Sequence, residues 1–396
     1  MPTPGRTRTN AEVSRRELLG MGVATALGTG IALVKGSASS AALHVDPFWG
    51  PHQPGIATPP RPHSTLAAFD VLTDRREDVV GLLKTWSAGA ARLCAGSPTT
   101  NKGAVSSGPL SVTFGFGSTL FELDGQDRFG IAARRPPRLI AMPTFEGDEL
   151  QPARTGGDLT VQVAGDDPKS VEGALRALSA AAAGAVSTRW VQKGFTAGTT
   201  GTGPPRDLLG FKDGIVNPSG RLQLARDVWV GAEGPAWLRG GSYLVARRIH
   251  IDLEAWNALS VAEQERVIGR DKASGAPLGG RLQGDPIDLS ARDDQGHLLI
   301  PASSHVALAA PANYGGGMIL RRSYSYDDTG SGGVDAGLLF LAYQRDPLRG
   351  FVPIFTRLAQ ADALRHFTVH TGGALVAMPP GTPGPGAWVG QPLFDS

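Results

Sequence analysis

Two stretches of this 396-residue chain carry charged residues that a turn or a strand alone would not need. The first is "DLLGFKDGIVNP", residues 207–218, where a Lys-Asp pair stands between apolar residues and a glycine. Gly210, Gly214 and the closing Asn-Pro pair supply what a tight turn requires. Asp213 is therefore either a turn acid, solvated or bonded to a backbone amide, or a carboxylate placed there for chemistry.

The second stretch is "IPASSHVALAAPANYGGGMILRRSYSYDD", residues 300–328. It places His305 after two serines, and it places Arg321 and Arg322 among glycines and tyrosines. A single histidine is most often structural, and an isolated Arg-Arg pair is most often a surface charge. The combination with Asp213 favours a functional site over both interpretations.

These stretches resemble the dye-decolourising haem peroxidases, and within that family the exported group that includes the deferrochelatase-like proteins. Four pieces of sequence carry the resemblance: the segment "FWGPHQPGIATP", the turn "GFKDG", "SSHVALAAP", and "ILRRSYSYDD" followed by "GLLFLAYQRDP". They occur in the order and at the spacing of the family, and they cover nearly all of the chain after its first residues. GxxDG alone would be a weak signal, whereas the set is a specific one.

The resemblance implies a haem peroxidase with one haem b per chain, held between the sheet and the helices of a C-terminal unit. His305 corresponds to the proximal ligand of the haem iron, Asp213 to the distal acid and Arg322 to the distal arginine. Arg321 is assigned to structure or to a haem propionate. Asp346 of "QRDP" is the candidate acceptor for the second N–H of the proximal imidazole.

In this scheme hydrogen peroxide is reduced to water through a ferryl intermediate, and phenolic or dye-like donors are oxidised by single electrons. One group must take a proton from the near oxygen of the peroxide and return it to the far oxygen, a role that suits Asp213. Arg322 would keep this acid ionised and stabilise charge on the departing oxygen. Gly210 and Gly214 would let the backbone approach the haem face closely.

Two further expectations follow from the family pattern. Many relatives carry a basic residue two places after the proximal histidine, where this chain has Ala307, so one contact to the haem periphery is expected to be missing. Donors too bulky to enter would be oxidised at the surface, with electrons passing through aromatic residues. Tyr324, Tyr326 and Tyr343 are favoured as relays because they flank the haem motifs.

A haem- or iron-handling binding protein is the alternative function. Such a protein would capture haem in the same pocket without turning over peroxide. Asp213 and Arg322 discriminate the two functions, because carriage needs an axial ligand but no distal acid or cation. His366 and His370 could bind a metal if they lay on a helix, but the residues between them favour a strand, and there is no HExxH glutamate.

The elements that must position these residues form two similar passages, residues 64–205 and 206–396. The order strand, Asp-Pro, helix recurs in "VQVAGDDPKSV" and "FLAYQRDPLRG". We therefore predict an α+β fold of duplicated ferredoxin-like units with mainly antiparallel sheets. Strands are expected at "AAFDVL", "RLIAMP", "DLTVQVAGDD" and "TRWVQKGFTA" in the first unit, and at "GSYLVARRIHIDL", "LLFLAYQRDP" and "LRHFTVHTGGALVAMPP" in the second.

Helices are expected between these strands. They are "REDVVGLLKTWSAGAARLC" and "PKSVEGALRALSAAAAGAVS" in the first unit, and "SVAEQERVIG" and "FVPIFTRLA" in the second. The third should begin with a capping box of Ser260 and Glu263. Cys94 lies on the apolar face of the first helix and, as the single cysteine, is expected to be a buried small hydrophobe.

The first 42 residues are predicted to be an export signal. Arg15 and Arg16 precede a weakly apolar stretch that is too short and too rich in small residues to span a membrane, a pattern similar to a twin-arginine signal. Export of a folded protein by the twin-arginine translocase, to an extracellular or cell-envelope location, is the expected result. Residues 43–63 are a Pro-rich arm that should run extended over the surface.

Composition narrows the remaining function classes. An apolar content of 41% and a charged content of 19% are those of a soluble globular protein, with no stable membrane insertion expected. The formal net charge is +2 with basic and acidic residues interleaved, so no basic stripe exists to follow a nucleic-acid backbone. The expected partners are hydrogen peroxide and small organic electron donors.

Overall fold

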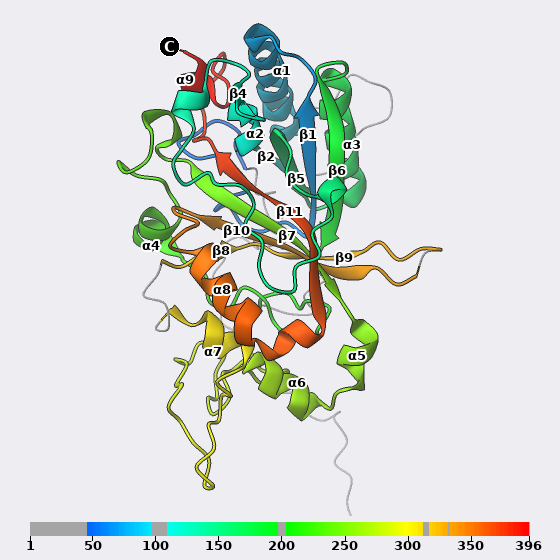
Figure 1. Cartoon of the computed structure of the whole chain (residues 1–396), viewed down its shortest axis with the longest axis vertical. Helices are drawn as coiled ribbons and strands as arrows, with labels where there is room; N and C mark the ends of the chain where they lie inside the picture. The colour runs from blue at the N-terminus through cyan, green and yellow to red at the C-terminus, as the bar shows by residue number, and fades with distance from the viewer. Residues whose placement is uncertain (1–45, 97–108, 197–202, 312–316, 332, 396) are drawn as a thin grey trace, which may run out of the picture. The chain divides into compact units, whose positions relative to one another are not determined.

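A computed structural model describes residues 46–96, 109–196, 203–311, 317–331 and 333–395, and Figure 1 shows the arrangement of the elements. The signal predicted at residues 1–42 lies outside this part of the chain. The strands are β1 (His63–Val71), β2 (Leu110–Gly117), β3 (Glu122–Leu123), β4 (Gln126–Asp127), β5 (Leu159–Gly165), β6 (Val186–Phe195), β7 (Ser242–Ile251), β8 (Leu320–Arg321), β9 (Tyr324–Asp327), β10 (Ala336–Gln344) and β11 (Thr368–Met378).

The helices connect these strands. They are α1 (Arg76–Cys94), α2 (Ser118–Phe121), α3 (Pro168–Ala181), α4 (Gly220–Asp227), α5 (Leu253–Ala258), α6 (Val261–Ile268), α7 (His305–Ala309), α8 (Phe351–Ala361) and α9 (Gln391–Phe394). Within the described residues, no helix is both long enough and apolar enough to cross a membrane.

Nine of the strands form one sheet in the order β7-β11-β2-β5-β1-β6-β9-β10-β8. Because β10 also pairs with β7, the sheet closes on itself, and the paired strands run antiparallel. Each half repeats one order, β6-β1-β5-β2 and then β11-β7-β10-β9, in which the last strand of the half lies beside its first. This is the ferredoxin-like order twice over, so the predicted fold class is confirmed.

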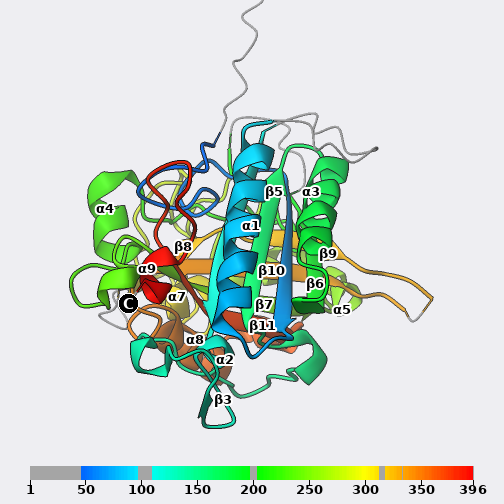
Figure 2. The same ribbon diagram turned by 90° about the horizontal axis from the view of Figure 1, so that it is seen from above.

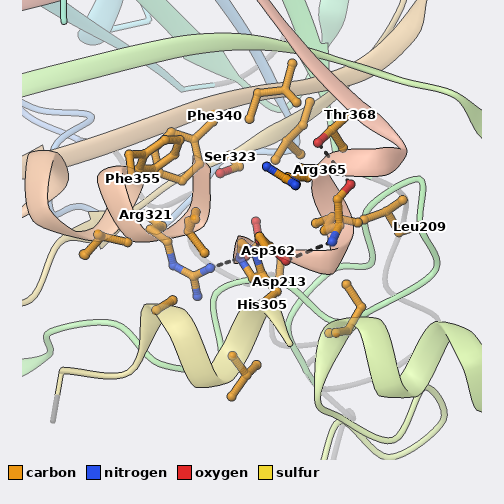
Figure 3. A pocket seen from close by; sticks show the side chains of 18 of the residues that line it. Leu209, Asp213, His305, Arg321, Ser323, Phe340, Phe355, Asp362, Arg365 and Thr368 are labelled. Carbon is orange, nitrogen blue, oxygen red and sulfur yellow. Dashed lines mark hydrogen bonds and ion pairs between the residues drawn. The ribbon is translucent and has the colours of Figure 1, made fainter. Parts of the chain in front are cut away.

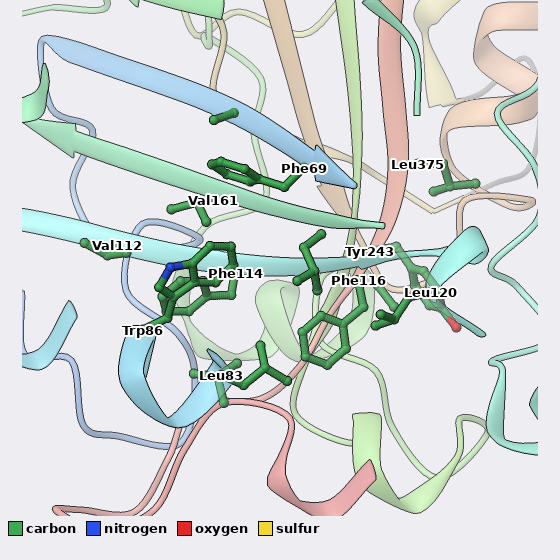
Figure 4. Packing of buried hydrophobic residues seen from close by; sticks show 14 of the residues in the cluster. Phe69, Leu83, Trp86, Val112, Phe114, Phe116, Leu120, Val161, Tyr243 and Leu375 are labelled. Atoms are coloured by element: carbon green, nitrogen blue, oxygen red, sulfur yellow. The ribbon is translucent and has the colours of Figure 1, made fainter. Parts of the chain in front are cut away.

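The first half has a tightly filled core beneath α1 and α3, which lie side by side over the sheet (Figure 2). Trp86 of α1 packs between Phe69 and Phe114, with ring centroids 5.4 and 5.8 Å away (Figure 4). Its indole N–H donates to Leu178 O of α3 at 2.9 Å. Cys94 is buried on the same helix, where burial raises the pKa of its thiol to about 12, so it is inert packing as expected.

In the second half, alternate side chains of a strand belong to two different hydrophobic clusters. On β7, Val245 and Ile249 face the helices, and Leu244 and Ala246 face a second cluster that lies between the two halves. The connection from β7 to β8 is long and carries α5, α6 and α7. The capping box at the start of α6 is present, with the side chains of Ser260 and Glu263 each accepting from the backbone of the other.

The strand prediction for the first half was wrong at two places. The segment "RLIAMP", residues 138–143, forms no strand, whereas β2 was not predicted. Residues 138–151 instead run to the second half without a helix or strand, and the N–H of Glu149 donates to His370 O of β11 at 2.9 Å. Pro136 and Pro137 directly before this segment, and Pro143 within it, cannot donate to a strand ladder, and the glycines within β2 hide its strand pattern.

The Pro-rich arm was predicted to run over the surface, but part of it is buried. Described from residue 46, it buries Phe48, Gln53 and Ile56, which are at most 3% exposed. The Gln53 carboxamide donates to Phe114 O at 2.9 Å and to Pro379 O at 2.8 Å, so it connects the arm to both halves. Proline content correctly indicated an irregular backbone here but gave no signal of burial.

Candidate active site

A cavity of about 570 Å³ lies in the second half, within the range usual for ligand pockets. Its apolar wall comes from the outer face of the sheet and from α8, and includes Ile249, Phe340, Phe355 and Leu358. Residues 207–216, α7 and the strand segment around β8 supply charged groups to the same cavity (Figure 3). The predicted location between sheet and helices of the second half thus contains a cavity.

His305 is the first residue of α7, and Ser304 caps the helix by accepting from the N–H of Ala307. The His305 Nδ1–H donates to Asp362 Oδ2 at 2.7 Å. Burial favours the neutral imidazole, but the Asp362 carboxylate outweighs it and raises the pKa of His305. With Nδ1 engaged, Nε2 is the ring nitrogen left to face a ligand.

The acceptor predicted for this imidazole was wrong. Asp346 pairs with Arg138 at 3.1 Å and accepts from the N–H of Leu348, and it does not line the cavity. Asp362 takes its place because it ends α8 beside α7 and accepts from the N–H of Leu364 through its other oxygen. Both carboxylate oxygens are therefore fixed before any ligand binds.

Asp213 is both a turn acid and a cavity residue. Its Oδ1 accepts from the N–H of Gly214 at 2.6 Å and pairs with Arg321 at 3.3 Å, and Figure 3 shows it near His305. Gly210 and Gly214 have φ of 85° and 81°, a conformation that favours glycine. Neither glycine lines the cavity among the described residues, so they shape the turn and do not form the wall.

The two adjacent arginines have exchanged the roles predicted for them. Arg321 lines the cavity and pairs with Asp213, while Arg322 donates to the carbonyl oxygens of Ile56, at 2.8 Å, and Thr58 in the arm. Strand alternation is the reason, because Arg321 and Ser323 share the cavity side and Arg322 faces away. Arg322 is therefore not the cation that faces Asp213.

Several polar residues of the cavity were not predicted, among them Asp207, Arg270 and Ser323. Burial and the neighbouring Asp213 charge raise the pKa of Asp207, at the start of the same loop, to about 7. Arg270 is 6% exposed and donates to Gly275 O at 2.7 Å. Ser323 Oγ is buried and has no hydrogen-bond partner among the described residues. The alternation Arg-x-Ser was the available signal for Ser323.

The first half also contributes to the cavity wall through Phe145 and Asp148. Asp148 forms a fully buried ion pair with Arg247 of β7 at 2.7 Å, and the Arg247 guanidinium also lies over the Phe145 ring. Burial and the Arg247 charge lower the pKa of His370 on β11 to about 3. No sequence spacing brings residues 145–148 near this cavity, so this wall could not be predicted.

The remaining singled-out residues lie elsewhere in the fold. Tyr324, Tyr326 and Tyr343 are at most 3% exposed, so none is itself a surface contact for a bulky donor. His370 lies on β11, as its strand pattern predicted, while His366 ends a short 3₁₀ helix. The described residues contain no group of three or more His, Cys, Asp or Glu that could hold a metal ion.

Known proteins match this chain along most of its length. The family model of the Dyp-type peroxidase N-terminal domain matches residues 53–196, and that of the C-terminal domain matches residues 204–383. A dye-decolorizing peroxidase of Thermobifida fusca is 39% identical, with 96% of this chain and 97% of that protein covered. A deferrochelatase of Escherichia coli is 35% identical, with 88% and 87% covered. Ferric DtpA from Streptomyces lividans is 38% identical and superposes with a TM-score of 0.83 over 89% of this chain and 98% of its own.

Proposed function

We propose, since the chain belongs to the Dyp-type peroxidase family and is a haem peroxidase, that His305, Asp213 and Arg321 carry its reaction. The observation that supports these roles is their placement around one cavity, where His305 is fixed by Asp362 and Asp213 is paired with Arg321. Arg321 replaces Arg322 in the scheme expected from the sequence.

The residues of the cavity fit haem b. The wall of Ile249, Phe340 and Phe355 suits an apolar macrocycle, and His305 has one ring nitrogen free for the iron. Ser323 Oγ is a buried polar atom that lacks a partner among the described residues and faces the same space. His305 would bind the iron, and Arg321 and Asp213, which form an ion pair in the same cavity, would act on the peroxide.

The chain's own groups perform the acid–base work. When bound, haem supplies the iron that binds hydrogen peroxide and the store for its two oxidising equivalents. Asp213 takes the proton from one oxygen of the peroxide and returns it to the departing oxygen, which leaves as water. Arg321 stabilises negative charge on that oxygen. Asp362 orients His305 and increases the basicity of the imidazole.

The test compares three single variants by stopped-flow absorbance after mixing the holoenzyme with peroxide. Asp213→Ala should react about 100- to 10,000-fold more slowly, with part of the rate restored by added formate or acetate. Arg321→Leu should lose a comparable factor without such rescue. Arg322→Leu is the matched control and should keep most of the rate. A parental rate for Asp213→Ala would mean that the proton is moved by another group.

A second function is favoured by one observation, since relatives at 35% identity are named deferrochelatase. Haem handling would use His305 and the apolar wall but would not need the Asp213 and Arg321 pair. Peroxide turnover with phenolic or anthraquinone donors separates the two. If the purified holoenzyme oxidises neither donor, haem or iron handling becomes the better assignment.

Export is proposed from the sequence alone. Arg15 and Arg16 support recognition by the twin-arginine translocase, which would deliver a folded, haem-loaded protein to the cell envelope or beyond. Replacing both with lysine should retain the protein inside the cell, measured as haem peroxidase activity in separated cell fractions. Continued export of active enzyme by this variant would contradict the route.

A further inference from the structure

The strand that carries Arg321 lies at an edge of the sheet. β8 pairs on one side with β10, where Arg321 lies opposite Ala342. The N–H of the next residue, Arg322, donates to Leu341 O of β10 at 2.8 Å. Successive backbone groups of a strand point to opposite sides, so the N–H and C=O of Arg321 point away from β10. These two groups need a partner from outside the sheet.

Asn217 provides that partner with a single side chain. Its Oδ1 accepts from the N–H of Arg321 at 2.9 Å, and its Nδ2 donates to Arg321 O at 2.9 Å. The carboxamide thus substitutes for one residue of a neighbouring strand. Pro218 follows directly and restricts Asn217 to an extended backbone, which limits the directions its side chain can take.

The same two segments also meet through their charged groups. Asp213 lies four residues before Asn217 in one loop, and its Oδ1 pairs with the Arg321 guanidinium at 3.3 Å. The loop therefore contacts Arg321 twice, at its backbone through Asn217 and at its side chain through Asp213. Together these two contacts restrict the position of the Asp213 carboxylate relative to the Arg321 guanidinium.

We infer that Asn217 is a positioning residue that sets the geometry of the Asp213 and Arg321 pair for the peroxide reaction. This inference rests on the proposed function. A displacement of about 1 Å in a catalytic group can cost about 100-fold in rate, so loss of both Asn217 bonds should slow the peroxide step by about 10- to 100-fold. Haem binding should change little, because Asn217 does not line the cavity.

Graded variants separate positioning from general destabilisation. Asn217→Ala removes both bonds, whereas Asn217→Asp keeps the acceptor for the N–H of Arg321 and loses the donor, so its rate should be intermediate. Ser219→Ala is the control, because Ser219 is exposed on the same loop and its side chain makes no capping bond to α4. The control should retain the parental rate and haem content.

Amide hydrogen exchange of the holoenzyme reports the bond directly. Peptides containing residue 321 should exchange faster in Asn217→Ala than in the parent, and Asn217→Asp should keep much of the protection. Unchanged exchange in Asn217→Ala would overturn the inference at its first step, whatever the rate.

A double-mutant cycle connects the bond to chemistry. If Asn217 acts through Asp213, adding Asn217→Ala to Asp213→Ala should cost little further rate, whereas independent effects would multiply. A parental rate for Asp213→Ala would reject the catalytic role proposed for Asp213, and with it the basis of this inference. A slow Asp213→Ala together with a parental rate for Asn217→Ala, or with fully multiplicative losses, would reject only the positioning role.

Discussion

The two halves of the fold share one strand order but fill the space between the sheet and its covering helices differently. In the first half, α1 and α3 press Trp86, Phe69 and Phe114 into contact, and the Trp86 indole bonds to the neighbouring helix. In the second half, the corresponding space holds the cavity of about 570 Å³ with Asp213 and His305 at its wall.

The difference arises in the first crossover of each half. In the first half, the 19-residue helix α1 follows β1 after a short turn and covers the sheet. In the second, the segment between β7 and β8 is divided into the short helices α5, α6 and α7, and the last of these presents His305. A duplicated unit can therefore gain a site when one covering helix is replaced by a longer, broken connection.

The largest effect on this contrast between the halves is expected from removing His305, the iron ligand proposed for the second half. His305→Ala should leave the protein with only a small part of its haem, because the iron loses its protein ligand while the apolar wall remains. The ratio of haem absorbance to protein absorbance after purification, without added imidazole, measures this. His297→Ala, at an exposed histidine, is the control. A full haem complement in His305→Ala would reject the ligand assignment.

Truncating one aromatic residue in each half compares the packed core of the first half with the cavity wall of the second. Trp86→Ala should lower the free energy of unfolding by about 3–5 kcal/mol, since a close-packed core cannot collapse around the space. Phe355→Ala, at the cavity wall, should cost less stability but weaken haem retention. Urea unfolding and haem absorbance measure the two effects. Equal losses of stability with unchanged haem in both variants would contradict the comparison.

The smallest of these effects concerns Asp207, a buried carboxyl group at the cavity of the second half. Because the pKa of Asp207 is raised to about 7, folding favours its protonated form, and stability falls as pH rises from about 4 towards 7. Between pH 5 and pH 8 the parent should lose on the order of 2–3 kcal/mol that Asp207→Asn retains. Asparagine can still accept from the N–H of Phe211. Urea unfolding at both pH values tests this, and an equal difference between the proteins at both would contradict it.

Much of the fold was predictable because most of its strands and helices show the expected local spacing of apolar residues in the sequence. The strand and helix patterns, the capping box at Ser260 and the repeated Asp-Pro motif gave the duplicated ferredoxin-like units. The failures were the strand expected at residues 138–143, the strand β2, whose glycines interrupt its pattern, and the arm, where burial of Gln53 depends on contacts with residues far away in the chain. Such contacts leave no periodic signal.

The site was predictable at the level of residue type and less so at the level of side-chain direction. His305 and Asp213 lie at the cavity as expected from their motifs. Choosing between Arg321 and Arg322 required knowing which face of a two-residue strand meets the cavity, and a one-residue error reverses the answer. Asp362 could not be found, because only the packing of α7 beside α8 brings it to His305.

Closure of the sheet has a consequence for when this protein can fold. β2 pairs with β11, joining Phe116 and Gly117 to Ala377 and Val376 near the other end of the chain. A ribosome must therefore release almost the entire polypeptide before the first half can complete its hydrogen-bonded neighbourhood, and such distant pairings make folding slow. Haem capture must come later still, since the cavity walls come mostly from the last elements synthesised. We therefore expect haem to be inserted only after most of the chain has been synthesised and folded.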